Sequence, residues 1–254
     1  MSRLLSLLLR DLKSSVGLSW HLLASQLVMP IVYIFILGLT LNRVIGNVTV
    51  DGTTISYVQF LAVGVAFSQL MLGASYAGAM IFFDKRMGMF EQILAGPFKR
   101  YEYFTSKILS VILQGLLGSF LVLIIASPLL IGLSLQPVGI LYVLYSLVFA
   151  SLFFGSLSLL ISAYVKTDQA LNVVFNSILP PLTFVSSIFY PLEIMPDVIK
   201  AIALANPLTY AADIARFGLF GMSSVTFPYA LFLLPLLSTI SLALAMRAAY
   251  RIRL

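Results

Sequence analysis

Six long stretches of the chain contain no Asp, Glu, Lys or Arg, and short connections separate them. An apolar helix of about 20 residues crosses the roughly 30 Å hydrocarbon core of a bilayer. Lipid offers no partners to backbone N–H and C=O groups, so a crossing segment must pair them internally, as a helix does. We therefore predict an all-α integral membrane protein with six transmembrane helices, at about residues 20–41, 57–83, 108–133, 140–165, 169–192 and 225–248.

The composition agrees with this class of protein. Hydrophobic residues make up 61% of the chain and charged residues 9%, whereas about a quarter of the residues of a soluble domain are charged. No connection is long enough for a large domain outside the membrane, so residues 1–254 should form a single transmembrane domain. Cysteine is absent, which excludes disulfides and thiolate metal sites.

The net charge of +6 is a signal of topology. Lys and Arg gather in the cytoplasmic connections of membrane proteins. If both termini are cytoplasmic, only Arg43, Lys200 and Arg216 of the 15 basic residues fall on the other side. We predict a multi-pass protein of the cell membrane with both termini in the cytoplasm, and no nucleic-acid partner.

The N-terminal segment before the first span has helical amphipathicity. Arg3, Arg10 and Lys13 fall on one side of the helix, and leucines on the other. This pattern is typical of a helix that lies in the membrane interface, in contact with lipid. The alternative, an extension of the first span, is disfavoured because Asp11 and Lys13 would lie in its path.

Two local patterns predict how neighbouring spans are joined and packed. The connection at residues 42–56 contains Asp51 and Gly52 between β-branched residues, which favours a small hairpin. In the second span, small residues form a strip that would let another helix approach closely: Gly73, Ala74, Ala77 and Gly78.

The connection at residues 84–107 is long enough to form structure of its own. Apolar residues recur in it at helical spacing, and Gly96-Pro97 should end the helix: Met87, Phe90, Ile93, Leu94 and Phe98. Glu91 faces away from this stripe. Spacing alone leaves two interpretations open, a helix resting on the inner leaflet and a helix docked in a groove of a partner protein.

The second long connection, residues 190–221, lies on the other side of the membrane. Pro196 suits the start of a short helix at 197–205, and Asn206 is a natural cap for a second helix that starts at Pro207 and ends at residue 220. Both helices are too short to span and too apolar for water, so we expect them to re-enter the outer half of the bundle. Asp213 and Arg216 either form an ion pair there or face the outer water.

Missing motifs exclude several functions. No G-x-x-x-x-G-K-[S/T] loop occurs, so the chain has no nucleotide site of that kind. No acidic residue lies within the six runs, which disfavours a proton- or sodium-coupled transporter. The one histidine, His21, is expected at an interface, and no residues have metal-ligand spacing. We predict no enzyme activity, cofactor or metal site in this chain.

Taken together, the two long connections resemble those of permease subunits of type-2 ATP-binding-cassette (ABC) exporters. The first carries that family's pattern at Arg86, Gly88 (one residue early), Glu91, Ile93 (in place of Leu), Pro97, Arg100 and Lys107. The second carries it at Pro191, Pro196, Asn206, Pro207, Tyr210 and Arg216. With the order of six spans, the resemblance covers essentially the whole chain.

The resemblance implies a division of labour between subunits. The chain would form a membrane dimer with a second permease copy, and a separate cytoplasmic ATPase would bind ATP and Mg. The helix at about 87–95 would be the coupling helix, with Glu91 as the polar contact and Phe90 and Phe98 as apolar anchors. The full set of ATPase contacts would be Met87, Phe90, Glu91, Ile93, Leu94 and Phe98. A solvated Glu91 is an equal alternative.

The resemblance also implies a re-entrant region that caps the exit route, with Pro196, Asn206, Pro207, Tyr210, Asp213 and Arg216 as its characteristic residues. The substrate would be hydrophobic or amphipathic, such as a drug, a lipid or a lipid-linked glycan. The alternative from another class is a membrane scaffold or insertion factor, which would dock a cytoplasmic partner without opening a transport path.

Overall fold

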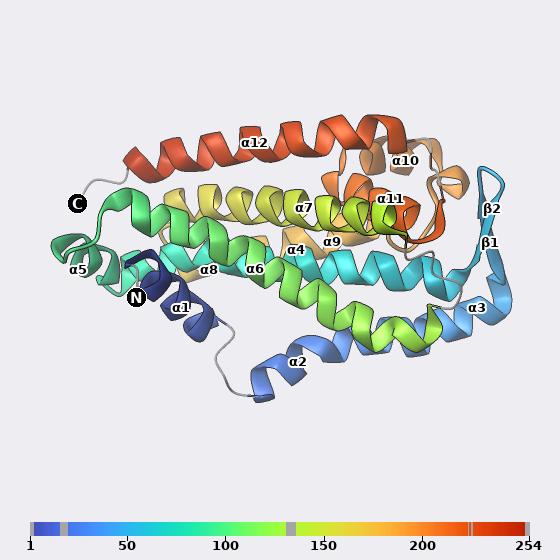
Figure 1. Cartoon of the computed structure of the whole chain (residues 1–254), viewed down its shortest axis with the longest axis horizontal. Coiled ribbons are helices and arrows are strands. Elements are labelled where there is room, and N and C mark those ends of the chain that lie inside the picture. The colour runs from blue at the N-terminus through green and yellow to red at the C-terminus, as the bar shows by residue number, and fades with distance from the viewer. Residues whose placement is uncertain (1–2, 16–19, 131–135, 223, 225, 252–254) are drawn as a thin grey trace.

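The computed structural model describes residues 3–15, 20–130, 136–222, 224 and 226–251. Long helices run roughly antiparallel along the longest axis of the molecule (Figure 1). One end of the bundle carries α1 (Arg3–Ser15), α5 (Met89–Ala95) and the last turns of α12 (Phe227–Arg251). The other end carries α10 (Asp197–Ala205) and the hairpin of β1 (Asn47–Val50) and β2 (Thr53–Ser56). We call these the α5 end and the hairpin end.

The first predicted span is a continuous helix at the edge of the bundle. It comprises α2 (Trp20–Ile31), the π-helical η1 (Val32–Gly38) and α3 (Leu39–Ile45). The predicted hairpin follows as β1 (Asn47–Val50) and β2 (Thr53–Ser56), paired antiparallel with Val50 opposite Thr53. Asp51 and Gly52 have φ of 47° and 78°, as the two central residues of a tight hairpin turn require.

The central helix of the bundle is α4 (Tyr57–Arg86). It packs against α6 (Arg100–Ala126), α7 (Pro137–Tyr164) and α11 (Pro207–Phe220). The predicted strip of small residues lies at these contacts: a Cβ built on Gly78 would meet the carbonyl oxygen of Gly155 at 2.1 Å. The absence of a side chain at Gly78 therefore sets how closely α4 and α7 approach.

The remaining elements complete the two ends of the bundle. They are α1 (Arg3–Ser15), α5 (Met89–Ala95), η2 (Ser127–Leu129), α8 (Asp168–Val173), η3 (Val174–Ile178), α9 (Leu179–Phe184), η4 (Leu192–Ile194), α10 (Asp197–Ala205) and α12 (Phe227–Arg251). Each of the six predicted spans overlaps helical residues, but two of them differ markedly from the prediction. The third begins eight residues early, because α6 starts at Arg100, and the fifth ends early.

The fifth span is shorter than the sequence predicts. We expected a helix over 169–192, but α8, η3 and α9 have six, five and six residues and end at Phe184. Pro180 and Pro181 cannot donate backbone hydrogen bonds. Beyond them the hydroxyls of Thr183 and Ser186 donate to the carbonyls of Pro180 and Thr183, a pairing that competes with regular helix.

By length and composition, five helices among the described residues could cross a membrane: Gln26–Ile45, Tyr57–Arg86, Arg100–Leu129, Pro137–Tyr164 and Phe227–Tyr250. The number rises to six if α10 and α11, which meet at 84°, count as one bent span. The fold is thus an all-α bundle with the composition of a membrane domain.

The N-terminal helix α1 packs against α6 and α4. The sequence assigned Arg10 to an outward, polar side, but its guanidinium reaches Asp84 of α4 at 3.0 Å. Asp11 is also turned inward and only 2% exposed. The polar residues of α1 therefore hold it to the bundle, while its position in a membrane interface stays a prediction.

Candidate functional site

The predicted coupling helix is α5, which begins two residues later than expected. Met87 and Gly88 form the turn before it, and Gly88 has a φ of 68°, in the left-handed region. The helix ends at Ala95, with Gly96 as its C-cap, so it stops before Pro97 as predicted. The turn allows the chain to reverse direction between α4 and α6, so that α5 stands at the tip of the bundle (Figure 1).

The predicted contact residues of α5 divide into two groups. Met87 is 69% exposed, Glu91 is exposed, and Ile93, Leu94 and Phe98 are half-buried. These side chains are available to another protein. Glu91 also interacts electrostatically with Lys85 at the end of α4.

Phe90 belongs to the second group and corrects the prediction. Its side chain is 0% exposed, and its ring contacts those of Tyr103 and Phe104 at centroid distances of 5.2 and 6.4 Å. In this arrangement Phe90 cannot reach a partner. The helical stripe indicated correctly that Phe90 is buried, but the burying surface is α6 of the same chain.

Next to Phe90 lies a charge cluster formed by the partly exposed Arg10 with the buried Asp11, Asp84 and Lys107, and completed by the buried Tyr103 hydroxyl. The ammonium of Lys107 lies 3.1 Å from Asp11 Oδ1 and 2.7 Å from Asp84 Oδ2. The Tyr103 hydroxyl donates to Asp84 at 2.7 Å. Two cations thus oppose two carboxylates, which is the balance that buried charges require.

Arg10 closes the cluster from α1, with hydrogen bonds to Asp11 and Asp84. Burial alone would lower the pKa of Arg10, but the two carboxylates outweigh it and raise that pKa above its ordinary value. The side chain stays charged. The cluster therefore joins α1, α4 and α6 through charge-assisted hydrogen bonds, which are stronger than neutral ones.

These contacts form a continuous route from α5 into the bundle. Phe90 packs against Tyr103, Tyr103 bonds to Asp84, and Asp84 bonds to Arg10 of α1. Through these contacts α5 is connected to α6, α4 and α1. The sequence held one signal of this cluster that our prediction missed: Asp84 and Lys107 each border a charge-free run.

At the hairpin end, the predicted helices α10 and α11 are present with the predicted boundary at Asn206–Pro207. The Asn206 side chain accepts from the Leu208 amide at 3.0 Å, so it caps α11. The Tyr210 hydroxyl donates to the Leu204 carbonyl, which ties α11 back to α10. Pro196 is the last residue before α10 and Pro207 the first of α11.

Asp213 and Arg216 form the expected ion pair, with 3.1 Å between Oδ1 and Nη1. Both side chains are buried, so the alternative that they face outer water is wrong. Arg216 also donates to the carbonyls of Phe60 and Ile188 and lies over the Phe60 ring at 3.5 Å. The pair thus fixes α11 against α4.

Asp213 has partners beyond Arg216. It accepts hydrogen bonds from the hydroxyls of Ser187, Ser224 and Thr226. These residues come from the segments before α10 and after α11, so the carboxylate ties both ends of the region together. The sequence predicted the pair but not these partners, which no periodic pattern marks.

Comparison with known proteins identifies the family. Residues 3–220 match the family model described as "ABC-2 type transporter". The chain belongs to this family. Its permease homologues are transport subunits rather than enzymes, and family members normally work with an ATPase partner.

The ABC-2 permease is similar to several curated proteins. It is 24% identical to the inner membrane transport permease YadH of Escherichia coli K12, over 78% of this chain and 77% of the relative. It is 24% identical to the putative transport permease ycf38 of Cyanophora paradoxa, over 83% of this chain and 71% of the relative. It is 27% identical to nodulation protein J of Azorhizobium caulinodans, over 74% of this chain and 72% of the relative. Together, these relatives and the apolar helices of the chain indicate a multi-pass membrane protein.

Within the part of this ABC-2 permease that the structure describes, no three His, Cys, Asp or Glu side chains gather as a metal site would require. The side chain of His21, which the sequence predicts at an interface, lies outside that part.

Proposed function

We propose that this permease is the membrane-spanning half of an ATP-driven exporter, with α5 as its coupling helix. The observation that carries the proposal is the route from α5 into the bundle. Exposed side chains such as Met87 and Glu91 are available to a partner, while Phe90 on the same helix packs against α6 beside the buried charge cluster. A force applied to α5 therefore has a direct mechanical path to the spans.

The partner in this proposal is a cytoplasmic ATPase that binds ATP and Mg. Closure of the ATPase would push α5, and the tightly packed Phe90–Tyr103 contact would transmit the displacement to α6. The charge cluster would carry it to α1 and α4. The spans would then move as rigid elements between inward-open and outward-open arrangements.

The remaining parts of the proposal follow the family pattern. Both termini and α5 would lie in the cytoplasm, and α10 and α11 would re-enter the membrane from outside and cap the exit. A second copy of the chain would complete the path as a homodimer. Because the charge-free runs offer no fixed charge to a substrate, the cargo would be hydrophobic or amphipathic, such as a drug, a lipid or a lipid-linked glycan.

The test compares two neighbouring residues of α5 in permease reconstituted with a candidate ATPase. Glu91→Ala should weaken ATPase association and leave thermal unfolding of the permease unchanged within about 0.5 kcal/mol. Phe90→Ala should destabilise the permease by roughly 3–5 kcal/mol, because it empties a buried aromatic site. Gln92→Ala, an exposed change on the same helix, is the control.

The readouts are co-purification of the ATPase and ATP-dependent movement of an amphipathic substrate across the vesicle membrane. If Glu91→Ala leaves association and transport intact, the assignment of α5 is wrong. If the ATPase binds but ATP drives no movement of any substrate tested, the chain acts as a scaffold.

A further inference from the structure

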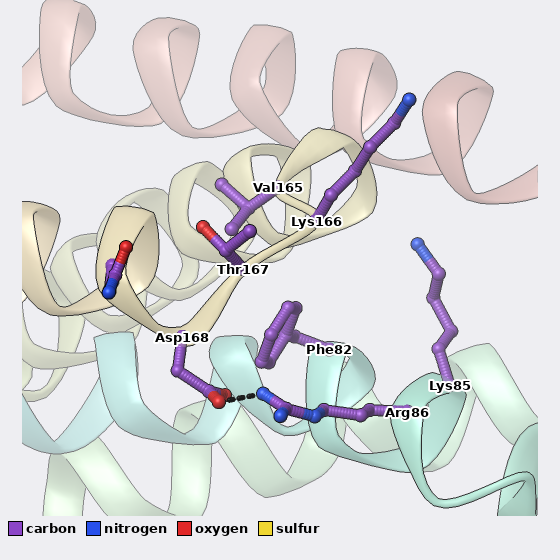
Figure 2. A pocket seen from close by; sticks show the side chains of 8 residues that line it. Phe82, Lys85, Arg86, Val165, Lys166, Thr167 and Asp168 are labelled. Atoms are coloured by element: carbon purple, nitrogen blue, oxygen red, sulfur yellow. Dashed lines mark ion pairs between the residues drawn. The ribbon is translucent and has the colours of Figure 1, made fainter.

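An open pocket of about 640 Å³ lies at the α5 end, between the last turn of α4 and the connection from α7 to α8 (Figure 2). Phe82 and Val165 supply its apolar lining. The other lining residues are polar or charged: Lys85, Arg86, Lys166, Thr167, Asp168 and Gln169. We call it the basic pocket. The volume is within the range of ligand sites in proteins, about 300–1,000 Å³.

The charges that line the basic pocket are unequal. Arg86 forms an ion pair with Asp168, so these two charges offset each other. Lys85 and Lys166 remain in excess and extend away from that pair in Figure 2. Glu91 of α5 acts on Lys85 electrostatically but does not line the pocket. The lining therefore favours an anion.

Lys85 is held in place by the bundle. Its ammonium donates to the Ala163 carbonyl at 3.0 Å, and an ammonium has further N–H groups for a second partner. Lys166 is exposed. One cation is thus positioned by backbone and the other can adjust to an incoming group.

The helices beside the pocket indicate its depth relative to the membrane. Two helices long and apolar enough to cross the membrane, α4 and α7, end beside the pocket. The pocket therefore lies at the level of lipid headgroups whichever side of the membrane it faces. Tyr164, next to the pocket, is 66% exposed, as aromatic residues at membrane interfaces often are.

We propose that the basic pocket binds a phosphate-bearing anion at the membrane surface, with Lys85 and Lys166 as the groups that recognise it. Lysine serves as a compact point charge for phosphate, and basic pockets between transmembrane helices bind anionic headgroups. The phosphate comes from an anionic lipid or from solution. The proposal goes beyond the proposed function and depends on neither the ATPase nor the direction of transport.

The experiment measures retention of lipid by the purified full chain in detergent, by native mass spectrometry. Phosphatidylglycerol is the anionic probe, phosphatidylcholine the zwitterionic one, and inorganic phosphate the soluble one. The wild-type chain should prefer phosphatidylglycerol. Lys85→Gln/Lys166→Gln should bind it about twenty-five-fold more weakly, because a basic residue near an anionic surface contributes about fivefold.

A matched control removes two exposed lysines that do not line the pocket, as Lys13→Gln/Lys99→Gln. Lys85→Arg/Lys166→Arg should retain binding. Lys166→Gln alone, an exposed change, gives the same test with a smaller expected loss if the double variant does not fold.

The outcomes separate the two sources of phosphate. Displacement of the lipid by millimolar inorganic phosphate, with equal retention of both lipids, identifies free phosphate as the ligand. Lipid preference without displacement identifies the headgroup. The proposal is overturned if no probe binds or if the control pair loses as much affinity as the pocket pair.

Discussion

At the scale of single residues, the informative feature is a lysine that is almost completely buried. Lys107 is 1% exposed and lies between two carboxylates. Removing one member of a buried ion pair leaves the other charge without compensation, which costs about 3–5 kcal/mol. The charge cluster is therefore expected to be a larger determinant of stability than any exposed ion pair.

We predict that Lys107→Met lowers the free energy of unfolding by about 3–5 kcal/mol, measured by thermal or denaturant unfolding in detergent. Lys13→Met, at an exposed lysine of α1, should change it by less than about 0.5 kcal/mol. Adding Asp11→Asn to Lys107→Met should recover part of the loss, because it removes one uncompensated carboxylate. Equal free energies of unfolding for wild type and Lys107→Met would contradict the role of the cluster in stability.

The buried pair at the hairpin end gives a second prediction. An isolated pair would tolerate exchange of its charges, but Arg216 faces the carbonyls of Phe60 and Ile188, and Asp213 faces three hydroxyls. A carboxylate at position 216 would meet hydrogen-bond acceptors. We expect Asp213→Arg/Arg216→Asp to unfold as easily as either single variant, each losing at least about 3 kcal/mol.

The exposed ion pair Arg86–Asp168 is the control for this measurement. Exchange of its charges as Arg86→Asp/Asp168→Arg should change stability by at most about 1 kcal/mol. Recovery of wild-type stability in the buried swap would show that the two charges act as an independent pair and that their other partners matter little.

At the scale of elements, helix contacts depend on where side chains are missing. Gly78 on α4 faces the backbone of Gly155 on α7, so no neighbouring side chain can move aside for a methyl group. Gly118 on α6 is different, since the nearest atoms to a Cβ there would be Cγ of Gln69 at 3.3 Å and the Gln69 carbonyl oxygen at 3.4 Å. The surroundings of the two glycines therefore differ in how well they tolerate an added methyl group.

Gly78→Ala should therefore destabilise the protein by about 3 kcal/mol or prevent folding, because overpacking here forces the backbones apart. Gly118→Ala should cost less than about 1 kcal/mol, or stabilise slightly through lower chain entropy in the unfolded state. The yield and unfolding midpoint of the two variants in one detergent give the comparison. Similar values for both would mean that α4 and α7 are not constrained at Gly78.

The elements also show how much of the structure the sequence predicts. Local signals located the hairpin turn at Asp51-Gly52 and the cap at Asn206 correctly, because each depends on a few consecutive residues. The fifth span was predicted too long, since absence of charge marks apolar residues and does not show where prolines and hydroxyls end a helix. Phe90 was recognised as buried, but its neighbours come from α6.

At the scale of the whole molecule, the two ends of the bundle differ in charge and in architecture. Basic residues gather at the end that carries α1, α5 and the end of α12, while the hairpin and α10 occupy the other. The rule that cytoplasmic connections are rich in Lys and Arg predicts that the α5 end is cytoplasmic. Because the chain has no cysteine, its orientation can be tested by introducing one at a time.

We predict that Val44→Cys, at an 80% exposed position of the hairpin end, reacts with a membrane-impermeant maleimide in intact cells. Lys99→Cys, at the α5 end, should react only after permeabilisation. The unmodified chain controls for labelling of other proteins. Reaction of Lys99→Cys in intact cells would show that the α5 end faces outward. A cytoplasmic ATPase could then not bind α5.

By itself the sequence determined the class of the protein, the order of its spans and the two long connections, because charge-free length and proline, glycine and asparagine signals act locally. Only the tertiary structure decided that Arg10, Asp84 and Lys107 form one cluster and that Phe90 joins α5 to α6. It also placed Lys85 and Lys166 at one pocket. Contacts of this kind join residues distant in sequence, and packing geometry alone selects them.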